Sequence, residues 1–271
     1  MQAIATPRTS YNPLMGFADV LRSEFLKLRS VRSTFWTLLA AVVFNVGLAA
    51  LAAVFIPGRL SAQDESTIDA VRLSLAGLHL SQIAVGALGV LVISSEYGTG
   101  MIRAVFSAVP QRRTVLAAKA TVFAAVALVV GIVSSFGAYF VFQASLSGDS
   151  LQSSISDPGV LRAVTGGGLY LAVLGLLGLG LGTIIRRSAG AIAALFGMLF
   201  VPPVLMDLLP QSWRATVGPY VPMNAGSQIF MTRPDAMGGG GLGPWTGFGV
   251  FSLYAALALT VGFILISHRD A

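Results

Sequence analysis

Six long runs of apolar residues alternate with shorter polar segments along the 271-residue chain. A helix needs about 20 consecutive apolar residues to cross the hydrocarbon core of a bilayer. The runs that approach or exceed this length cover 34–56, 73–95, 120–142, 168–185, 189–206 and 245–267. Their apolar residues are continuous, whereas the strands of a transmembrane β-barrel alternate apolar and polar residues. The pattern therefore predicts an all-α integral membrane protein with six membrane-spanning helices.

An amphipathic pattern precedes the first run. Phe17, Leu21, Phe25 and Leu28 recur at helical spacing, and basic residues occupy much of the remaining surface. We expect this segment to lie at the cytoplasmic membrane interface, with its basic side chains toward lipid phosphates. The alternative is a plain basic anchor that only orients the first span. The chain would then divide into a cytoplasmic tail with its interface helix (1–33) and a six-helix transmembrane domain (34–271).

The connection between the second and third runs, 96–113, is longer than a reversal of direction requires. From Thr99 onward, apolar residues that include Ile102 and Phe106 follow one helical stripe, and Thr99 could cap the start of that helix. Pro110 lies where the chain must turn back. By contrast, the five residues RRSAG suffice between the fourth and fifth runs. The pattern predicts a short amphipathic helix outside the bilayer.

Charged residues flank this predicted helix. Glu96 lies at the membrane boundary, where it could pair with Arg103, pair with the N-terminal helix, or simply end a solvated helix. Lys119, with the two arginines that follow Pro110, leads into the third span and is expected to anchor it at the interface.

The segment between the fifth and sixth runs, 207–244, is also unusual. It contains PQSWRATVGPYVPMNAGSQIF, which is apolar enough to dip into the bilayer as a re-entrant or interfacial segment. Irregular backbone at that depth has to be buried in protein or face water, because lipid offers it no hydrogen bonds.

Composition supports the membrane assignment. Apolar residues make up 55% of the chain and charged residues 10%, where soluble domains carry about 25% charged residues. The mean hydropathy is +0.80. The chain contains no cysteine, which excludes disulfides, thiolate metal sites and cysteine nucleophiles.

The net charge of +6 is best explained by topology. With a cytoplasmic N-terminus, twelve basic residues fall on the inner side and five on the outer side. Six spans then place both termini in the cytoplasm. Because this bias accounts for the positive charge, we do not expect nucleic acid as a partner.

Few polar residues interrupt the spans. Asn45, His79 and Gln82 are candidates for a substrate pathway, since a polar group inside a membrane span is often functional. Interhelical hydrogen bonding is the plainer explanation. A pathway so poor in charge would suit an apolar or amphipathic substrate.

Motifs for chemistry on this chain are missing. Neither Lys27 nor Lys119 lies in the G-x-x-x-x-G-K-[ST] loop that binds nucleotide phosphates. Neither H-E-x-x-H nor G-x-S-x-G occurs, and His79 and His268 are the only histidines. We therefore expect no enzyme activity, catalytic residue, metal or cofactor on this chain.

The segment EYGTGMIRAVFSAVPQRRTVLAAK, from Glu96 to Lys119, resembles a motif of the membrane subunits of type-2 ABC transporters, as found in actinobacteria. SEFLKLRSVRSTFW near the N-terminus and PYVPMNAGSQ in the outer segment resemble the corresponding parts of that family. The resemblance covers most of the chain.

The resemblance implies a permease subunit of an exporter in a bacterial plasma membrane. The segment 96–113 would contain the coupling helix, which docks on a separate ATPase subunit that binds ATP and Mg²⁺. A second copy of this permease, or a related one, would complete the complex. The implied ATPase-contact residues are Glu96, Thr99, Ile102, Arg103, Phe106 and Pro110. Ile102 and Phe106 would be exposed for that contact, and Arg103 would pair with an acidic partner residue.

Three other classes remain open. An ATP-independent secondary carrier would need buried acids or broken helices at mid-membrane, and no carboxylate lies centrally in a span. An intramembrane serine protease would have to use His79 as its base. A non-transporting scaffold or immunity-type protein could share the permease fold.

Overall fold

The structure, a computed structural model, describes residues 16–56, 69–146, 152–232 and 241–268. Regular secondary structure in these ranges is helical throughout. Six helices are long and apolar enough to cross a membrane, which confirms the six predicted spans and the all-α membrane fold. They are α2 (Arg32–Phe55), α5 (Leu78–Gly98), α7 (Arg112–Ser145), α8 (Val160–Ile185), α9 (Ser188–Leu208) and α12 (Pro244–His268).

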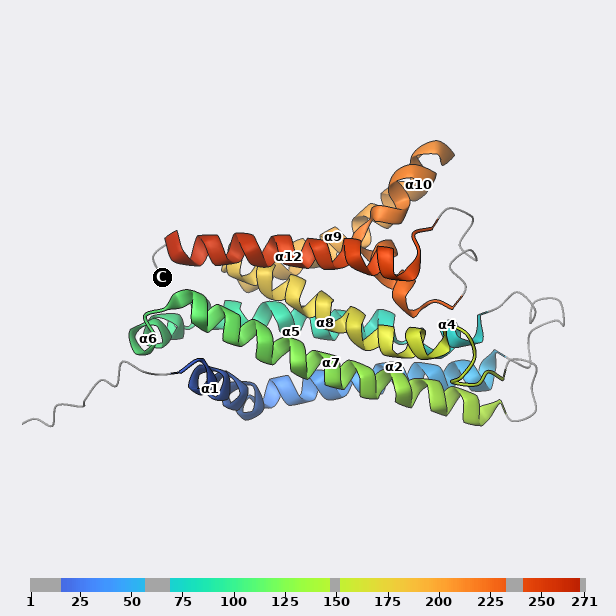
Figure 1. Cartoon of the computed structure of the whole chain (residues 1–271), viewed down its shortest axis with the longest axis horizontal. Coiled ribbons are helices and arrows are strands. Elements are labelled where there is room, and N and C mark those ends of the chain that lie inside the picture. The colour runs from blue at the N-terminus through green and yellow to red at the C-terminus, as the bar shows by residue number, and fades with distance from the viewer. Residues whose placement is uncertain (1–15, 57–68, 147–151, 233–240, 269–271) are drawn as a thin grey trace, which may run out of the picture.

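Helix α8 forms the centre of the bundle, where it packs against α5, α7, α9 and α12 (Figure 1). In its most apolar 18-residue stretch 67% of the residues are buried, against 17% in α9. Glycines allow this close packing. A Cβ on Gly89 of α5 would lie 2.2 Å from the carbonyl oxygen of Gly175, and one on Gly178 would lie 2.7 Å from that of Gly86. Backbones this close leave no room for a side chain.

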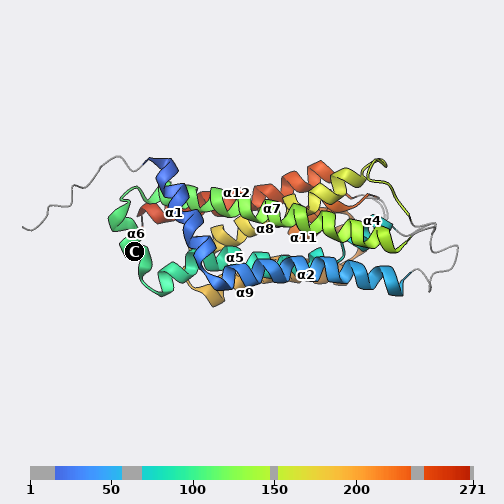
Figure 2. The ribbon, with the colours of Figure 1, turned by 90° about the horizontal axis from the view of Figure 1, so that it is seen from below.

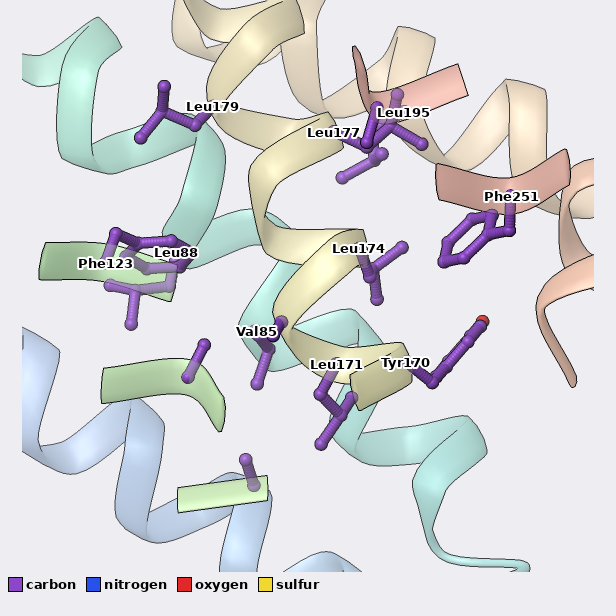
Figure 3. Packing of buried hydrophobic residues seen from close by; sticks show 14 of the residues in the cluster. Val85, Leu88, Phe123, Tyr170, Leu171, Leu174, Leu177, Leu179, Leu195 and Phe251 are labelled. Atoms are coloured by element: carbon purple, nitrogen blue, oxygen red, sulfur yellow. The ribbon is translucent and has the colours of Figure 1, made fainter. Parts of the chain in front are cut away.

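Large side chains fill the space on both sides of α8 (Figure 3). Leu171 and Leu174 of α8 are buried in one cluster with Val85 of α5 and Phe123 of α7. Toward α12, the ring of Tyr170 stacks on Phe251 with 5.2 Å between ring centroids. The bundle interior is therefore closely packed around its central helix.

Two short helices, α1 (Phe17–Ser30) and α6 (Met101–Ala108), lie at the end of the bundle where α12 also finishes (Figure 1). We call this the α1–α6 end. Helix α1 runs across the bundle instead of along it (Figure 2). The start of α1 and the end of α12 therefore share one end of the molecule. The predicted tail at 1–15 lies outside the described residues.

The opposite end carries the segment expected to be re-entrant, which the structure divides in two. Helix α10 (Gln211–Val217) has no buried residue and projects away from the bundle (Figure 1). After the turn η2 (Gly218–Tyr220), α11 (Pro222–Ser227) and η3 (Gln228–Phe230) are largely buried against α8 and α12. The backbone of this second part thus lies inside protein, and its depth in the membrane stays a prediction. Residues 233–240 of the predicted loop lie outside the described residues.

Span boundaries differ from the sequence prediction where a helix begins later and where helices extend past their apolar cores. The second span begins at Leu78, because a turn at 75–77 separates it from the short helix α4 (Ala70–Ser74). Asp69 caps α4 by accepting a hydrogen bond from the backbone N–H of Arg72 at 3.1 Å. Helices α7 and α8 begin eight residues earlier than predicted, and both first turns contain arginine, which interrupts the apolar pattern.

Candidate functional site

A sharp turn separates the second span from α6. Helix α5 ends at Gly98, and Gly100 then adopts φ +73°, a left-handed conformation that favours glycine. Helix α6 ends at Ala108, and Pro110 stands two residues before α7 begins. The amphipathic helix predicted between the second and third spans is therefore present, outside the spans.

The apolar stripe of α6 faces the bundle, which corrects the expectation that it is exposed. Ile102 is 2% exposed and Phe106 is 9% exposed, and both belong to the main core cluster. The guanidinium carbon of Arg112 lies 5.3 Å from the centroid of the Phe106 ring. Burying these two side chains removes apolar surface from water, so the stripe attaches α6 to its own bundle.

The opposite face of α6 is exposed. Met101 is 52% exposed, and Arg103, Ala104 and Ser107 are exposed as well. The flanking residues Thr99 and Pro110 are also exposed. Of the residues expected to contact a partner, Thr99, Arg103 and Pro110 are accessible, whereas Ile102 and Phe106 are not.

Glu96 is withdrawn from the surface too, because it belongs to a network of four charged side chains, of which Glu24, Glu96 and Lys119 are buried and Lys27 is partly exposed. Its Oε1 accepts hydrogen bonds from Lys119 Nζ at 2.9 Å and from Lys27 Nζ at 3.3 Å. Glu24 completes the network, with 2.6 Å from Oε2 to Lys119 Nζ and 2.6 Å from Oε1 to Lys27 Nζ. We call these residues the ionic network. Of the pairings considered for Glu96, the structure selects the N-terminal helix.

The ionic network connects three elements that are distant in sequence. Glu24 and Lys27 come from α1, Glu96 from the last turn of α5, and Lys119 from the third turn of α7. Lys119 is 2% exposed, so it is not the interface anchor that its flanking position suggested. Two positive and two negative groups balance, which offsets the cost of removing each from water.

Lys27 keeps its charge under ordinary conditions. Burial alone would lower its pKa, but the hydrogen bond and charge of Glu24, together with the charge of Glu96, raise the pKa above 10.5. A raised lysine pKa stabilises the fold below the unfolded-state value, and this contribution is lost only as pH rises through the folded-state pKa. Lys27 is therefore a charged member of the ionic network at neutral pH.

Sequence reasoning did not identify Glu24, Lys27 and Lys119 as one site. A signal was nevertheless present, since these two lysines are the only ones among 17 basic residues. Both take part in the ionic network. Counting the basic residues on each side of the membrane treats lysine and arginine alike. Such a count therefore does not distinguish the two lysines from the arginines.

Helix α1 is packed on the bundle as well as being amphipathic. Val20 and Glu24 are buried, and the helix packs mainly against α7. Phe17 and Phe25 of the predicted interface stripe are about half exposed, while Leu21 and Leu28 are partly buried. The helix and its exposed aromatic residues match the prediction; its contact with lipid stays a prediction.

Further polar contacts hold the same end of the bundle together. Ser94 of α5 and Ser188 of α9 are hydrogen-bonded, with 2.8 Å between their hydroxyl oxygens. Arg186, in the tight turn between α8 and α9, has φ +61°, and its guanidinium carbon lies 4.9 Å from the centroid of the Tyr97 ring. The last turn of α5, which carries Glu96 and Tyr97, is therefore fixed from several sides.

The candidate pathway residues lie in helix contacts. Asn45 donates a hydrogen bond to Ser134 Oγ at 2.9 Å, which joins α2 to α7. Gln82 accepts one from the hydroxyl of Tyr170 on α8. His79 packs edge-on against Phe230, with 6.1 Å between ring centroids. Asn45 and Gln82 are fully buried. Both side chains therefore form hydrogen bonds between helices, which is the plainer explanation considered for them.

A comparison with models of protein families gives a match. The model of a family described as "ABC-2 family transporter protein" matches residues 20–203. The matched segment begins within α1 and ends within α9, so it includes α6 and all four residues of the ionic network. No curated protein matches the chain.

Proposed function

This chain belongs to the ABC-2 family of transporter proteins, and from that premise we propose that it is the permease subunit of an ATP-driven exporter. It is a multi-pass membrane protein and a component of a transporter. The bacterial plasma membrane as its location, cytoplasmic termini and outward transport belong to the proposal. The α1–α6 end would then face the cytoplasm.

The motor of this exporter is a separate ATPase subunit. The chain has no P-loop motif, so ATP and Mg²⁺ would bind to that partner. The observation that carries the proposal is the exposed face of α6, formed by Met101, Arg103, Ala104 and Ser107. A helix that is fixed to the bundle on one side and open on the other can receive a soluble domain and remain part of the membrane subunit.

The ionic network would transmit a movement of α6, driven by the ATPase subunit, to the membrane-spanning helices. Glu96 precedes the turn into α6 by only a few residues and is tied to α7 and α1. A displacement of α6 by the ATPase would therefore act on the ends of α5, α7 and α1 together. Rigid helices joined by a buried polar network carry such coupling.

The substrate would pass between two permease chains instead of through one. The bundle of a single chain is filled by α8 and its neighbours, and Asn45 and Gln82 are engaged in helix contacts. A second copy, or a related permease, would provide the other wall of the pathway. This arrangement agrees with the apolar character of the bundle surface.

Purification of the tagged full-length chain from its host in mild detergent tests the proposal. We expect a soluble protein with a P-loop to co-purify in near-equal amount and to hydrolyse ATP faster in the complex than alone. Arg103→Glu should weaken both the association and the stimulation, because it reverses a charge on the exposed face of α6.

Arg187→Glu is the matched control, since it reverses a charge on an exposed residue of the tight turn between α8 and α9, outside α6. A partnerless chain, or equal effects of the two substitutions, would contradict docking on α6.

A further inference from the structure

A groove lies on the surface of the bundle at the α1–α6 end, between α1, α7 and α12. Its volume is about 520 Å³. Phe17 contributes from α1, and Phe263 and Ile264 contribute from α12. Arg113 and Ala117 line it from the first turns of α7. Neither the ionic network nor the exposed face of α6 is part of this groove.

Charge and apolar surface are separated along the groove. Arg113 is the one charged side chain among its seven lining residues, and it stands at the end of the bundle, where its Nη2 lies 3.3 Å from Ser267 Oγ. Ala117 is one turn further along α7, about 6 Å deeper at 1.5 Å per residue. Thr260 lies about 10 Å deeper along α12 than Ser267 by the same measure. The groove is cationic at its rim and apolar below.

We propose that this groove is a binding site for a phospholipid with an anionic headgroup. The phosphate would pair with the guanidinium of Arg113, whose planar donors suit phosphate oxygens. An acyl chain would lie along Ala117, Phe263 and Ile264. This order of charge above hydrocarbon is the order within a phospholipid.

The surroundings favour lipid over a protein partner. On α12, Leu257 and Val261 beside the groove are exposed apolar side chains, as expected of a surface that faces hydrocarbon. The nearest acid on α1, Asp19, accepts a hydrogen bond from the backbone N–H of Gly16 at 3.2 Å. Arg112 lies next to Arg113 and adds to the positive potential at the rim.

A lipid in this groove would support the start of α1. Helix α1 is held to α7 by the ionic network, whereas Phe17 faces α12 across the groove. The acyl chain would fill the space between them. This site depends on the described groove alone and stands whether or not the chain couples to an ATPase.

Native mass spectrometry of the purified full-length chain, titrated with phosphatidylglycerol or phosphatidylcholine, tests the site. We expect one tightly held phosphatidylglycerol per chain and weaker retention of phosphatidylcholine. Arg113→Gln should weaken phosphatidylglycerol binding about tenfold and remove the preference, because it deletes one charge-assisted contact. Thr260→Trp should reduce binding of both lipids, because it fills the groove from an exposed position.

Val261→Trp is the control, since Val261 is an exposed neighbour on α12 that does not line the groove. It should bind both lipids as the unsubstituted chain does. Equal lipid retention by all three variants would overturn the proposal. So would a change of oligomeric state in Thr260→Trp without a change in lipid binding, because another protein chain would then cover the groove.

Discussion

At the residue scale, the ionic network is the feature with the largest energetic consequence. Its four charges are held by contacts of 2.6 to 3.3 Å in a largely buried setting. A balanced network of this kind adds little stability compared with apolar packing, but losing one member leaves another charge buried and unpaired. The effect of a substitution therefore depends on whether charge balance is kept.

Lys119→Met should lower the free energy of unfolding by about 3–5 kcal/mol, because Glu24 and Glu96 lose the buried one of the two lysines that they share. Adding Glu24→Gln should recover part of that loss, since Lys27 and Glu96 then remain as a neutral pair. Chemical unfolding in detergent micelles measures both effects.

Arg29→Met, on an exposed position of α1, is the control for that experiment and should change stability by no more than about 0.5 kcal/mol. If Lys119→Met behaves like Arg29→Met, the four charges are not energetically coupled.

Sequence alone indicated some residues of this site and not their partners. Glu96 stood out as an acid at a span boundary, and its pairing with the N-terminal helix was one of three options. Lys119 was predicted to lie at the interface, because it follows two arginines at the start of the third span. This sequence distance does not show how deeply Lys119 is buried. Contacts between α1, α5 and α7 depend on packing in space, which a linear pattern does not contain.

At the element scale, close contact between α5 and α8 depends on glycine. Gly89→Ala should destabilise the bundle by about 1–3 kcal/mol, because the added Cβ would meet the Gly175 backbone at 2.2 Å. Gly197→Ala on α9 is the matched control, since nothing lies within 4 Å of its Cβ position. Thermal unfolding should show a loss for the first variant only; an unchanged unfolding temperature of Gly89→Ala would mean that α5 and α8 can move apart without penalty.

Phe106 offers a second test at this scale. Phe106→Asp places a charge in the core contact of α6, so we expect a lower yield of folded protein and a lower unfolding temperature. Ala104→Asp, on the exposed face of the same helix, should fold normally. Size-exclusion profiles and melting curves distinguish the two. Normal folding of Phe106→Asp would show that α6 is not fixed by its apolar stripe.

The existence of α6 followed from helical periodicity, but its orientation did not. A stripe of apolar residues shows that a helix has an apolar and a polar face. It does not show whether the chain's own bundle or a partner protein covers the apolar face. In the structure the chain's own bundle covers Ile102 and Phe106. The loop before α12 presents the same limit, because its apolar sequence divides between exposed α10 and buried α11.

At the scale of the whole molecule, the six spans and their order were predictable because each hydrophobic run is long enough to be read independently. Boundaries were less accurate where first turns that contain arginine extend the helices, as in α7 and α8. The central place of α8 had one sequence signal, its closely spaced glycines, which indicate close packing without naming the neighbours. The family match supports the transporter assignment for most of the chain.

Orientation in the membrane can be tested with the two ends of the bundle. The absence of cysteine allows single reporters at Ser107 on α6 and Ser212 on α10, both exposed. We expect Ser107→Cys to react with an impermeant maleimide only from the cytoplasmic side and Ser212→Cys only from the outside. The reversed pattern would invert the topology, and labelling of both from one side would contradict the six-span arrangement.

The confinement of both lysines to the ionic network has a practical consequence for amine chemistry. Acylating reagents modify neutral amines, and Lys119 is buried while the Lys27 side chain is 32% exposed. While α1 stays packed against α5 and α7, the two lysines should therefore resist acylation. An event that separates α1 from α5 and α7 would expose both amines together. The extent of acylation of Lys27 and Lys119 would thus report whether α1 is packed against the spans.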